Sequence, residues 1–382
     1  MDLSWSDEQL RLRDAVLSFA ERELADDVAA RDGSETFPHD LWGRCAKFGI
    51  LGLPVPEEHG GQGADVMTTL LALETLGYGC RDNGLIFSIN AHMWSSAMPI
   101  LRFGTAEQKA AYLPGLCDGS LIGVQGMTEP DTGSDAFALA TRADDDGDGF
   151  VLNGSKTFIT NAPVADIFVV FAATNPALGA LGLSAFLVDR ATPGLTVGRP
   201  LHKMGLRTSP MSELFFDDCR LDRSRLLGRT GNGIAIFNHS IDWERACILA
   251  AAVGTMQRQV DDSVRYAKER RQFGRPIGDF QAVSNRIADM QVRVDASRML
   301  LYRAGWAKQQ GVRAPARESA TAKLFISEAW VQTSLDAMYL RGGSGYLVES
   351  EVERDVRDAL ASRIYSGTSD IQRNIISNGL GL

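Results

Sequence analysis

Cysteine and histidine are scarce in this chain of 382 residues. The five cysteines lie far apart and form no Cys-x-x-Cys pair, so neither a disulfide framework nor a zinc site is indicated. The five histidines likewise lack the His-x-x-x-His and His-Glu-x-x-His spacings of metal-binding helices. We therefore predict a reduced protein without a metal site.

Long hydrophobic runs and an excess of positive charge are also missing. The run ACILAAAVG has under half of the ~20 apolar residues that a membrane-spanning helix needs. The N-terminal stretch MDLSWSDEQLRLRD has no basic segment followed by an apolar one, so nothing in it marks the chain for secretion. A formal net charge of -9 opposes general binding to nucleic acids. We expect a cytoplasmic enzyme that binds neither membranes nor nucleic acids.

Three common nucleotide and nucleophile motifs are absent. The chain contains no Gly-x-Gly-x-x-Gly and no alternation of strands and helices, which argues against a Rossmann nucleotide site. It also contains no P-loop and no Gly-x-Ser-x-Gly elbow. Any nucleotide cofactor must therefore be bound by residues outside these three motifs.

The order of patterns along the chain predicts an α+β protein with three domains. Residues 1–120 are predicted to be helical, beginning with a capping box formed by Ser6 and Gln9. Residues 121–230 contain short runs rich in Val, Phe, Ile and Leu between turn residues, which predicts a small antiparallel β unit, with ADDDGDG at 143–149 as a hairpin turn. Helical periodicity returns in residues 231–382.

One acidic residue stands out in a helix predicted to begin near Gly233. Glu244 and Arg245 lie in or beside an apolar stripe, between Ile241 and Ile248. The two residues could form a structural ion pair. Alternatively, a carboxylate in an apolar pocket has a raised pKa and can act as a base near neutral pH. The stripe comprises Ile234, Phe237, Ile241, Ile248 and Ala252.

Several other segments could bind an anionic ligand. The stretch YAKERRQFGRP (266–276) concentrates basic residues that could bind a pyrophosphate or could end a solvated helix. The turns TEPDTGSD and LRGGSGY contain glycines that would let a ligand approach the backbone. Each of these signals is weak alone.

Taken in order, VQGMTEPDTGSD, LNGSKTFITN, YAKERRQFGRPIGDFQ, LRGGSGYLVES and RIYSGTSDIQRN resemble the acyl-CoA dehydrogenase family over essentially the whole chain. The resemblance implies an N-terminal helical domain, a middle β domain and a C-terminal four-helix bundle, assembled as a homotetramer with one FAD per subunit. It implies desaturation of the Cα–Cβ bond of an acyl thioester, in which a carboxylate removes the α-proton and the flavin accepts hydride.

The resemblance also implies which residues contact FAD. The isoalloxazine side should be held by Met127, Thr128, Ser134, Phe158 and Thr160. The FAD of a neighbouring subunit should be reached by Arg270, Gln272, Phe273, Gly342 and Gly343. The final loop should contribute Thr368 and Asp370, whereas Tyr339 replaces a Gln found in many relatives.

The catalytic base departs from the commonest family pattern. Many members carry the catalytic Glu where this chain has Ser366. A minority, resembling the isovaleryl and long-chain enzymes, place it on the bundle helix in a DxER context, which IDWERACILAAAVG matches. Glu244 is therefore the predicted base, and Arg245 is predicted to order the pocket or the substrate. The backbone N–H of Ser366 is predicted to donate to the thioester oxygen.

A small residue at 366 suits branched or ring-containing acyl groups. We favour a prolyl or similar group on a carrier protein of natural-product biosynthesis, with a short branched acyl-CoA of catabolism as the alternative. Electrons would pass to an electron-transferring flavoprotein or to oxygen. A flavin monooxygenase on the same fold and a non-catalytic thioester-binding protein are further alternatives.

Overall fold

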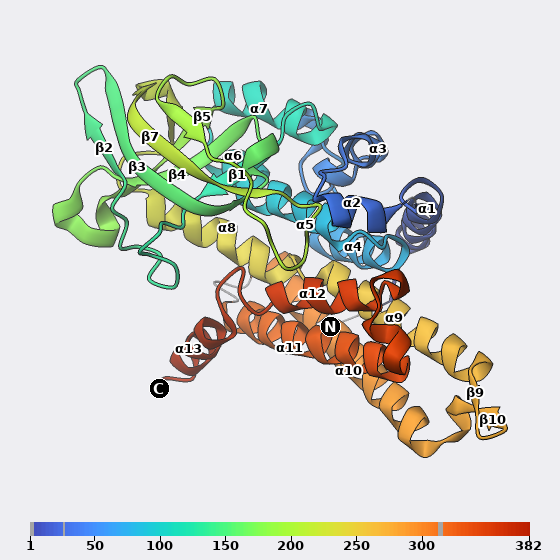
Figure 1. The fold of residues 1–382 in the computed structure, drawn as a ribbon. Coiled ribbons are helices and arrows are strands. Elements are labelled where there is room, and N and C mark those ends of the chain that lie inside the picture. The colour runs from blue at the N-terminus through green and yellow to red at the C-terminus, as the bar shows by residue number, and fades with distance from the viewer. Residues whose placement is uncertain (1–3, 26, 312–315) are drawn as a thin grey trace.

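The computed structural model describes residues 4–25, 27–311 and 316–382. Figure 1 shows a group of N-terminal helices beside a β unit, with the C-terminal helices packed below both. The first three residues of the predicted N-terminal helical domain lie outside the described residues. The predicted α+β order of helices, β unit and helices is confirmed.

The N-terminal helices begin with the predicted capping box. The Ser6 side chain accepts a hydrogen bond from the N–H of Gln9, and the Gln9 side chain accepts one from the N–H of Ser6. A π-helical turn at Met93–Ala97 joins two of the later helices. The helices are α1 (Asp7–Glu23), α2 (Val28–Ser34), α3 (His39–Phe48), α4 (Val66–Gly79), α5 (Asn83–His92), α6 (Met98–Phe103) and α7 (Ala106–Asp118).

The β unit is an eight-stranded sheet that is mostly antiparallel. The prediction of an antiparallel unit was wrong for two pairings, because β1 pairs in parallel with β4 along its length and β2 pairs in parallel with β4 at Arg142 and Ala173. The long connection between β1 and β4, which includes the hairpin of β2 and β3, gives the chain room to return in the same direction. The strands are β1 (Gly123–Gly126), β2 (Arg142–Asp145), β3 (Gly149–Thr160), β4 (Ile167–Ala173), β5 (Leu183–Asp189), β6 (Leu195–Val197), β7 (Met211–Asp222) and β8 (Leu226–Leu227).

The C-terminal helices form a bundle that ends in a short hairpin on one side. The prediction of one helix running from Gly233 past Ala252 was wrong, because Leu249 adopts φ -94° and ψ 8° and separates α8 from α9. As a result, α8 lies below the β unit and α9 enters the bundle (Figure 1). The elements are α8 (Gly233–Cys247), α9 (Ala250–Glu269), β9 (Arg271–Gln272), β10 (Arg275–Pro276), α10 (Gln281–Gln309), α11 (Ala316–Leu340), α12 (Val352–Ala361) and α13 (Ser369–Gly379).

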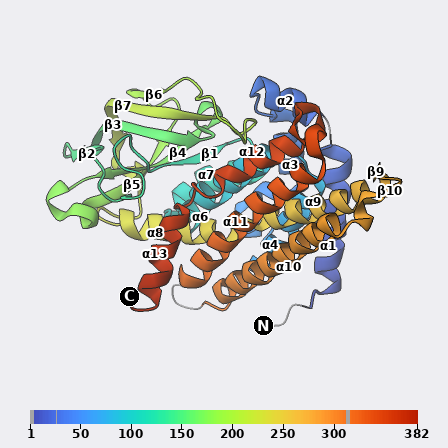
Figure 2. The ribbon, with the colours of Figure 1, turned by 60° about the horizontal axis from the view of Figure 1, so that its bottom comes forward.

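Helices α4 and α9 pack backbone against backbone. A Cβ atom at Gly254 would lie 1.8 Å from the carbonyl oxygen of Glu74, and one at Gly77 would lie 2.0 Å from that of Ala251. The hydroxyl of Thr255 donates to the carbonyl oxygen of Gly77 across the same contact. Figure 2 shows α4 beside α9 and α10. This contact fixes the start of α9 against the N-terminal helices.

Within the described part of the chain, no helix combines the length and the apolar character that crossing a membrane requires.

Candidate active site

Two of the predicted site residues meet where α8 ends. The hydroxyl of Ser366 donates a hydrogen bond of 2.6 Å to Oε1 of Glu244. Glu244 comes from the last turn of α8, and Ser366 lies in the loop between α12 and α13. The structure therefore brings the predicted base and the predicted oxyanion-side residue into direct contact through the side chain of Ser366.

Cationic and amide side chains hold the loop in an unusual backbone conformation. Ser366 has φ +56° and Gly367 has φ +85°. The Ser366 carbonyl accepts hydrogen bonds from Nε of Arg245 (3.3 Å) and Nε2 of Gln372 (3.1 Å). The Gly367 carbonyl accepts from Nζ of Lys323 and Nε2 of Gln372, both at 2.8 Å. The backbone N–H of Ser366 has no hydrogen-bond partner among the described residues, which leaves it free to donate to a ligand.

The surroundings of Glu244 raise the pKa of its carboxyl group. Burial is the largest cause, and it outweighs the hydrogen bond from Ser366 and the positive charges of Arg245 and Lys323, which lower the pKa. Burial, together with the charge of Arg245, also lowers the pKa of Lys323 to about 8. A carboxylate with a raised pKa is a stronger base than an exposed one, as α-proton removal requires.

A small pocket lies between α5, α9 and the final loop, and two of its lining residues, Ile248 and Tyr365, are close in sequence to Glu244 and Ser366. The N–H of Ile248 donates to the Glu244 carbonyl, and Tyr365 directly precedes Ser366. The ring of Tyr365 packs on Phe87 at a centroid distance of 4.7 Å. Asn90 also lines the pocket and accepts a hydrogen bond from Trp94 Nε1. The pocket therefore has an aromatic and aliphatic wall with a few polar groups.

A second group of predicted residues forms a surface on the β unit that suits a flat ring. β3 is irregular between Lys156 and Ile159, and Phe158 has φ +57° there with a side chain that is 61% exposed. The N–H of Thr157 donates to the carbonyl of Thr128, which joins this irregularity to the loop after β1. An exposed aromatic side chain can pack against the flat isoalloxazine ring. Strained backbone conformations of this kind cluster at functional sites. Of the other predicted contacts, Thr128, Ser134 and Thr160 are partly or fully exposed, whereas the side chain of Met127 is buried in a hydrophobic cluster.

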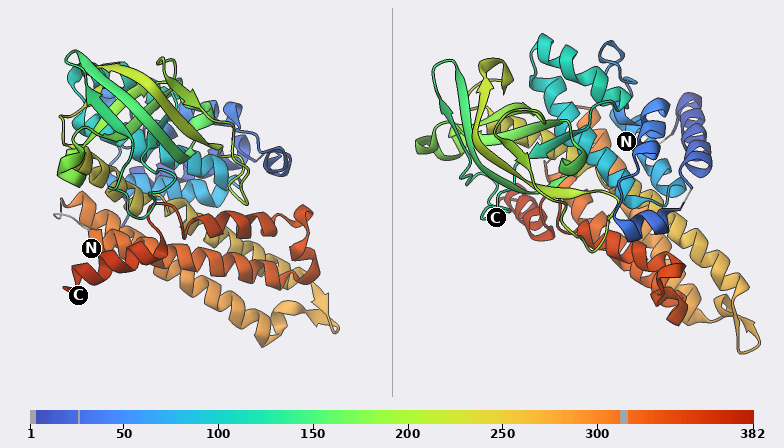
Figure 3. Two further views of the ribbon diagram at one scale, coloured as in Figure 1. Left: turned by 60° about the vertical axis from the view of Figure 1, so that its left-hand side comes forward. Right: turned by 45° about the horizontal axis from the view of Figure 1, so that its top comes forward.

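Other predicted cofactor residues lie far from Glu244 in the same chain. Arg270, Gln272 and Phe273 lie at or beside the hairpin of β9 and β10, and Phe273 is 92% exposed. Both views in Figure 3 place this hairpin at the opposite end of the bundle from the C-terminus. The exposed Gly342 and Gly343 begin a turn after α11. This separation is compatible with their predicted role toward the FAD of a neighbouring subunit, and that role stays a prediction.

The remaining predicted residues have local roles in the structure. Thr368 caps the N-terminus of α13 by accepting a hydrogen bond from the N–H of Ile371. Asp370 pairs with Arg373 at 3.0 Å. Tyr339, the departure from the family pattern, is exposed and lies under the guanidinium of Arg286.

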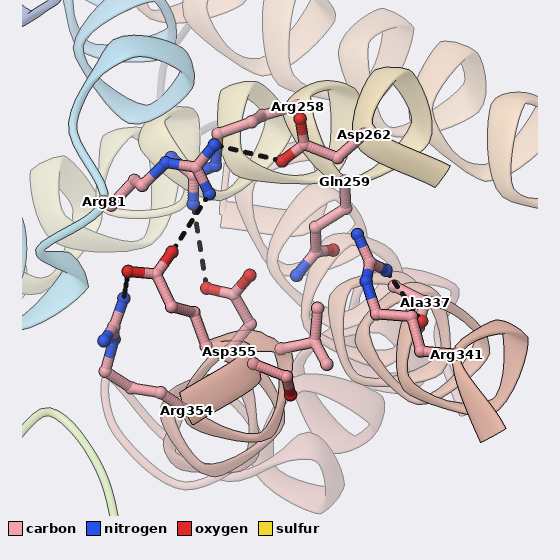
Figure 4. A pocket seen from close by; sticks show the side chains of 11 residues that line it. Arg81, Arg258, Gln259, Asp262, Ala337, Arg341, Arg354 and Asp355 are labelled. Atoms are coloured by element: carbon pink, nitrogen blue, oxygen red, sulfur yellow. Dashed lines mark hydrogen bonds and ion pairs between the residues drawn. The ribbon is translucent and has the colours of Figure 1, made fainter. Parts of the chain in front are cut away.

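Ion pairs line a separate pocket, which is drawn in Figure 4. Arg81 bridges Asp262 (3.2 Å) and Glu351 (3.3 Å), and Arg258 lies 3.7 Å from Asp355. These pairs join the start of α5 to α9 and α12. Because its charges are largely paired and it contains none of the predicted site residues, this pocket is a structural joint between the N-terminal and C-terminal helices.

The sequence pattern did not reveal three of the contacts that shape the site. The motif around Ser366 indicated a role for its backbone N–H and none for its hydroxyl. Gln372 belongs to the RIYSGTSDIQRN motif, so the motif could have pointed to it. Lys323 is buried in α11 and no local pattern singles it out.

Comparisons with known proteins establish the family. The models for the acyl-CoA dehydrogenase N-terminal domain, middle domain and C-terminal domain match residues 6–120, 125–219 and 231–381. The chain belongs to the acyl-CoA dehydrogenase family, which confirms the family, the fold and the enzyme class predicted from the motifs.

Similar individual proteins include enzymes named for prolyl groups on carrier proteins. An L-prolyl-[peptidyl-carrier protein] dehydrogenase of Pseudomonas fluorescens is 44% identical, over the full length of both chains. The crystal structure of the prolyl acyl carrier protein oxidase AnaB is 47% identical, with a TM-score of 0.97 over 99% of this chain and 100% of AnaB. A structure of PigA with FAD and proline is 42% identical, with a TM-score of 0.97 over 100% of both chains.

Proposed function

We propose that this acyl-CoA dehydrogenase uses FAD to oxidise a prolyl group that is held as a thioester on a carrier protein. The observation that carries the proposal is the contact between Glu244 and Ser366 beside a pocket with an aromatic wall. The prolyl substrates named for the similar enzymes support the choice of acyl group. A short branched acyl-CoA is the alternative substrate.

Glu244 removes the α-proton of the bound thioester. The thioester carbonyl makes this proton acidic, and negative charge develops on the carbonyl oxygen as the proton leaves. The uncommitted N–H of Ser366 donates to that oxygen, and Arg245 holds the Ser366 carbonyl so that the N–H keeps its direction. When bound, FAD supplies the acceptor for the hydride that leaves Cβ.

The β unit and the final loop hold FAD. Met127, Thr128, Ser134, Phe158 and Thr160 would hold the isoalloxazine side, and the exposed ring of Phe158 supports this assignment. Thr368 and Asp370 would hold the cofactor at the start of α13, where a helix N-terminus favours anionic groups.

A homotetramer completes the cofactor site. Arg270, Gln272, Phe273, Gly342 and Gly343 lie far from Glu244 in their own chain and are exposed, which supports contacts with the FAD of a neighbouring subunit. The acceptor of the electrons from the substrate would be an electron-transferring flavoprotein or oxygen. The rate at which reduced enzyme is reoxidised in air, compared with the rate in the presence of an electron-transferring flavoprotein, distinguishes these two acceptors.

Anaerobic bleaching of the flavin tests the proposal. Prolyl thioester on a carrier protein and isovaleryl-CoA are each mixed with the wild-type enzyme and with Glu244→Gln. We expect bleaching by the prolyl carrier in the wild type and a loss of about 10²-fold to 10⁴-fold in the variant. Bleaching by isovaleryl-CoA alone would assign the enzyme to acyl catabolism. Near-normal bleaching in the variant would remove Glu244 from its role, and no bleaching by either substrate would favour a monooxygenase.

A further inference from the structure

The ring nitrogen is what distinguishes a prolyl group from a simple carbocyclic acyl group. It is bonded directly to the carbon that loses its proton, so a group that binds it must lie close to the carboxylate of Glu244. The polar atoms around this carboxylate are therefore the candidates.

The charged neighbours of Glu244 are already committed to the final loop. Arg245 donates to the carbonyl of Ser366, and Lys323 donates to that of Gly367. Both are cations with no acceptor atom, so neither can accept a hydrogen bond from a ring N–H. The hydroxyl of Ser366 is used by Glu244 itself.

Three other polar side chains that line the pocket, Asn83, Asn90 and Thr255, are committed as well, whereas Nε1 of Trp330 is buried without a partner and can only donate. Asn83 donates to Asp358 at 3.0 Å, and Thr255 donates to Asn83 Oδ1 at 3.2 Å. Asn90 donates to the carbonyl of Ile86 and accepts from Trp94. Asn83, Asn90 and Thr255 would each have to give up a buried hydrogen bond, or share it, in order to bind a ligand.

Tyr365 also lines the pocket, and its hydroxyl, which can both donate and accept, makes no hydrogen bond with another described residue. It directly precedes Ser366 in the loop that reaches Glu244. Burial, followed by the negative charges of Glu244 and Asp358, raises the pKa of this hydroxyl, so it stays protonated. A neutral hydroxyl donates one hydrogen bond and also accepts, and it can therefore bind a secondary amine or its protonated form.

We propose that the hydroxyl of Tyr365 binds the ring nitrogen of the substrate and so selects a cyclic amino-acyl group over a carbocyclic one. This inference rests on the proposed function. The contact fixes the rotation of the ring about the bond between Cα and the thioester carbon, and the Cα–H then faces Glu244. Phe87, packed against the Tyr365 ring, holds the hydroxyl in place.

A pair of substrates that differ only in the ring atom tests this role. Prolyl and cyclopentanecarbonyl thioesters on the same carrier protein are compared in anaerobic flavin reduction by wild type and Tyr365→Phe. We expect the variant to lose about 10-fold to 100-fold on the prolyl substrate, as one unmade hydrogen bond to a buried polar group predicts, and less than about 3-fold on the carbocycle. Equal losses on both substrates would overturn the inference.

Binding without turnover gives a second readout. In the Glu244→Gln background, the Tyr365→Phe change should weaken binding of the prolyl carrier and leave that of the cyclopentanecarbonyl carrier unchanged. The flavin spectrum of each variant checks that the fold is kept. If wild-type enzyme neither binds nor oxidises the prolyl carrier, the proposed function fails. If wild-type enzyme binds and oxidises the prolyl carrier, but the Tyr365→Phe change affects the prolyl and cyclopentanecarbonyl substrates equally, only the inference about Tyr365 fails.

Discussion

Ser366 donates a hydrogen bond of 2.6 Å to Glu244 although the two lie 122 positions apart in the sequence. Many family members carry a glutamate at the position of Ser366, whereas here a hydroxyl at that position contacts a glutamate from another helix. The contact favours the ionised carboxylate and opposes the effect of burial on its pKa. Together with burial and the nearby cations, it therefore influences the pH range in which Glu244 can act as a base.

Replacing Ser366 by alanine should move the pH profile of flavin reduction to higher pH. Glu244 removes a proton only when it is ionised, so the rate rises as pH passes through its pKa. The hydrogen bond from Ser366 lowers this pKa, and its loss raises the pKa further above the ordinary value. We expect a larger loss of rate at pH 6 than at pH 9, measured by anaerobic stopped-flow with the prolyl carrier.

Ser369→Ala is the matched control, because it removes a hydroxyl from the same region that donates to Glu328 instead. Its pH profile should match that of the wild type. An unchanged profile in Ser366→Ala would mean that the hydroxyl does not act on the base. Alanine keeps the backbone N–H, so the proposed contact with the thioester oxygen is not removed.

Phe158→Gly should weaken FAD binding without lowering the stability of the apoprotein. Phenylalanine at φ +57° is strained, and glycine relieves about 1 kcal/mol of this strain. The exposed ring contributes little to the core, so the apoprotein should unfold at the same or a higher temperature. The flavin loses its aromatic contact, and we expect about a 10-fold rise in the Kd for FAD, measured by flavin fluorescence. A lower Tm of the apoprotein would instead assign the ring to the packing of the β unit.

Local pattern and motif order were enough to predict the fold class and to single out Glu244. Its position in the apolar stripe and its DxER context both depend on residues within a few turns of one helix. The hydroxyl contact of Ser366 depends on a left-handed backbone in a loop that folds back onto α8, which no local pattern encodes. Lys323 and the parallel pairing of β1 are non-local in the same way. The break between α8 and α9 at Leu249 was not predicted, because the residues around it are compatible with a continuous helix.

Glu129 and Lys156 form a buried ion pair that should stabilise the β unit beside the predicted flavin surface. Nζ of Lys156 lies 2.7 Å from Glu129 Oε1, and the same carboxylate accepts the N–H groups of Ala140 and Thr141. Glu129→Ala leaves a buried cation unpaired and two N–H groups without their acceptor. We expect the free energy of unfolding to fall by about 3 to 5 kcal/mol in urea titrations.

The exposed pair between Arg142 and Asp144 supplies the comparison for this prediction. Asp144→Ala should change the free energy of unfolding by less than about 1 kcal/mol, because solvent screens the pair. Similar losses in Glu129→Ala and Asp144→Ala would mean that the buried pair adds no more than the exposed one.

Gly254→Ala should separate α9 from α4 and reduce both stability and activity. The added Cβ would meet the Glu74 carbonyl at 1.8 Å, and neither backbone can move aside without shifting its helix. We expect a loss of about 2 kcal/mol or more in the free energy of unfolding, which is typical of overpacking. The start of α9 also forms part of the wall of the proposed substrate pocket, so flavin reduction should slow in the molecules that remain folded.

Gly43→Ala is the control, since its Cβ would meet nothing within 4 Å on the exposed face of α3. Alanine favours a helix over glycine, so this control should be stabilised by about 0.5 to 1 kcal/mol. Equal effects of the two changes would show that the contact between α4 and α9 tolerates a methyl group.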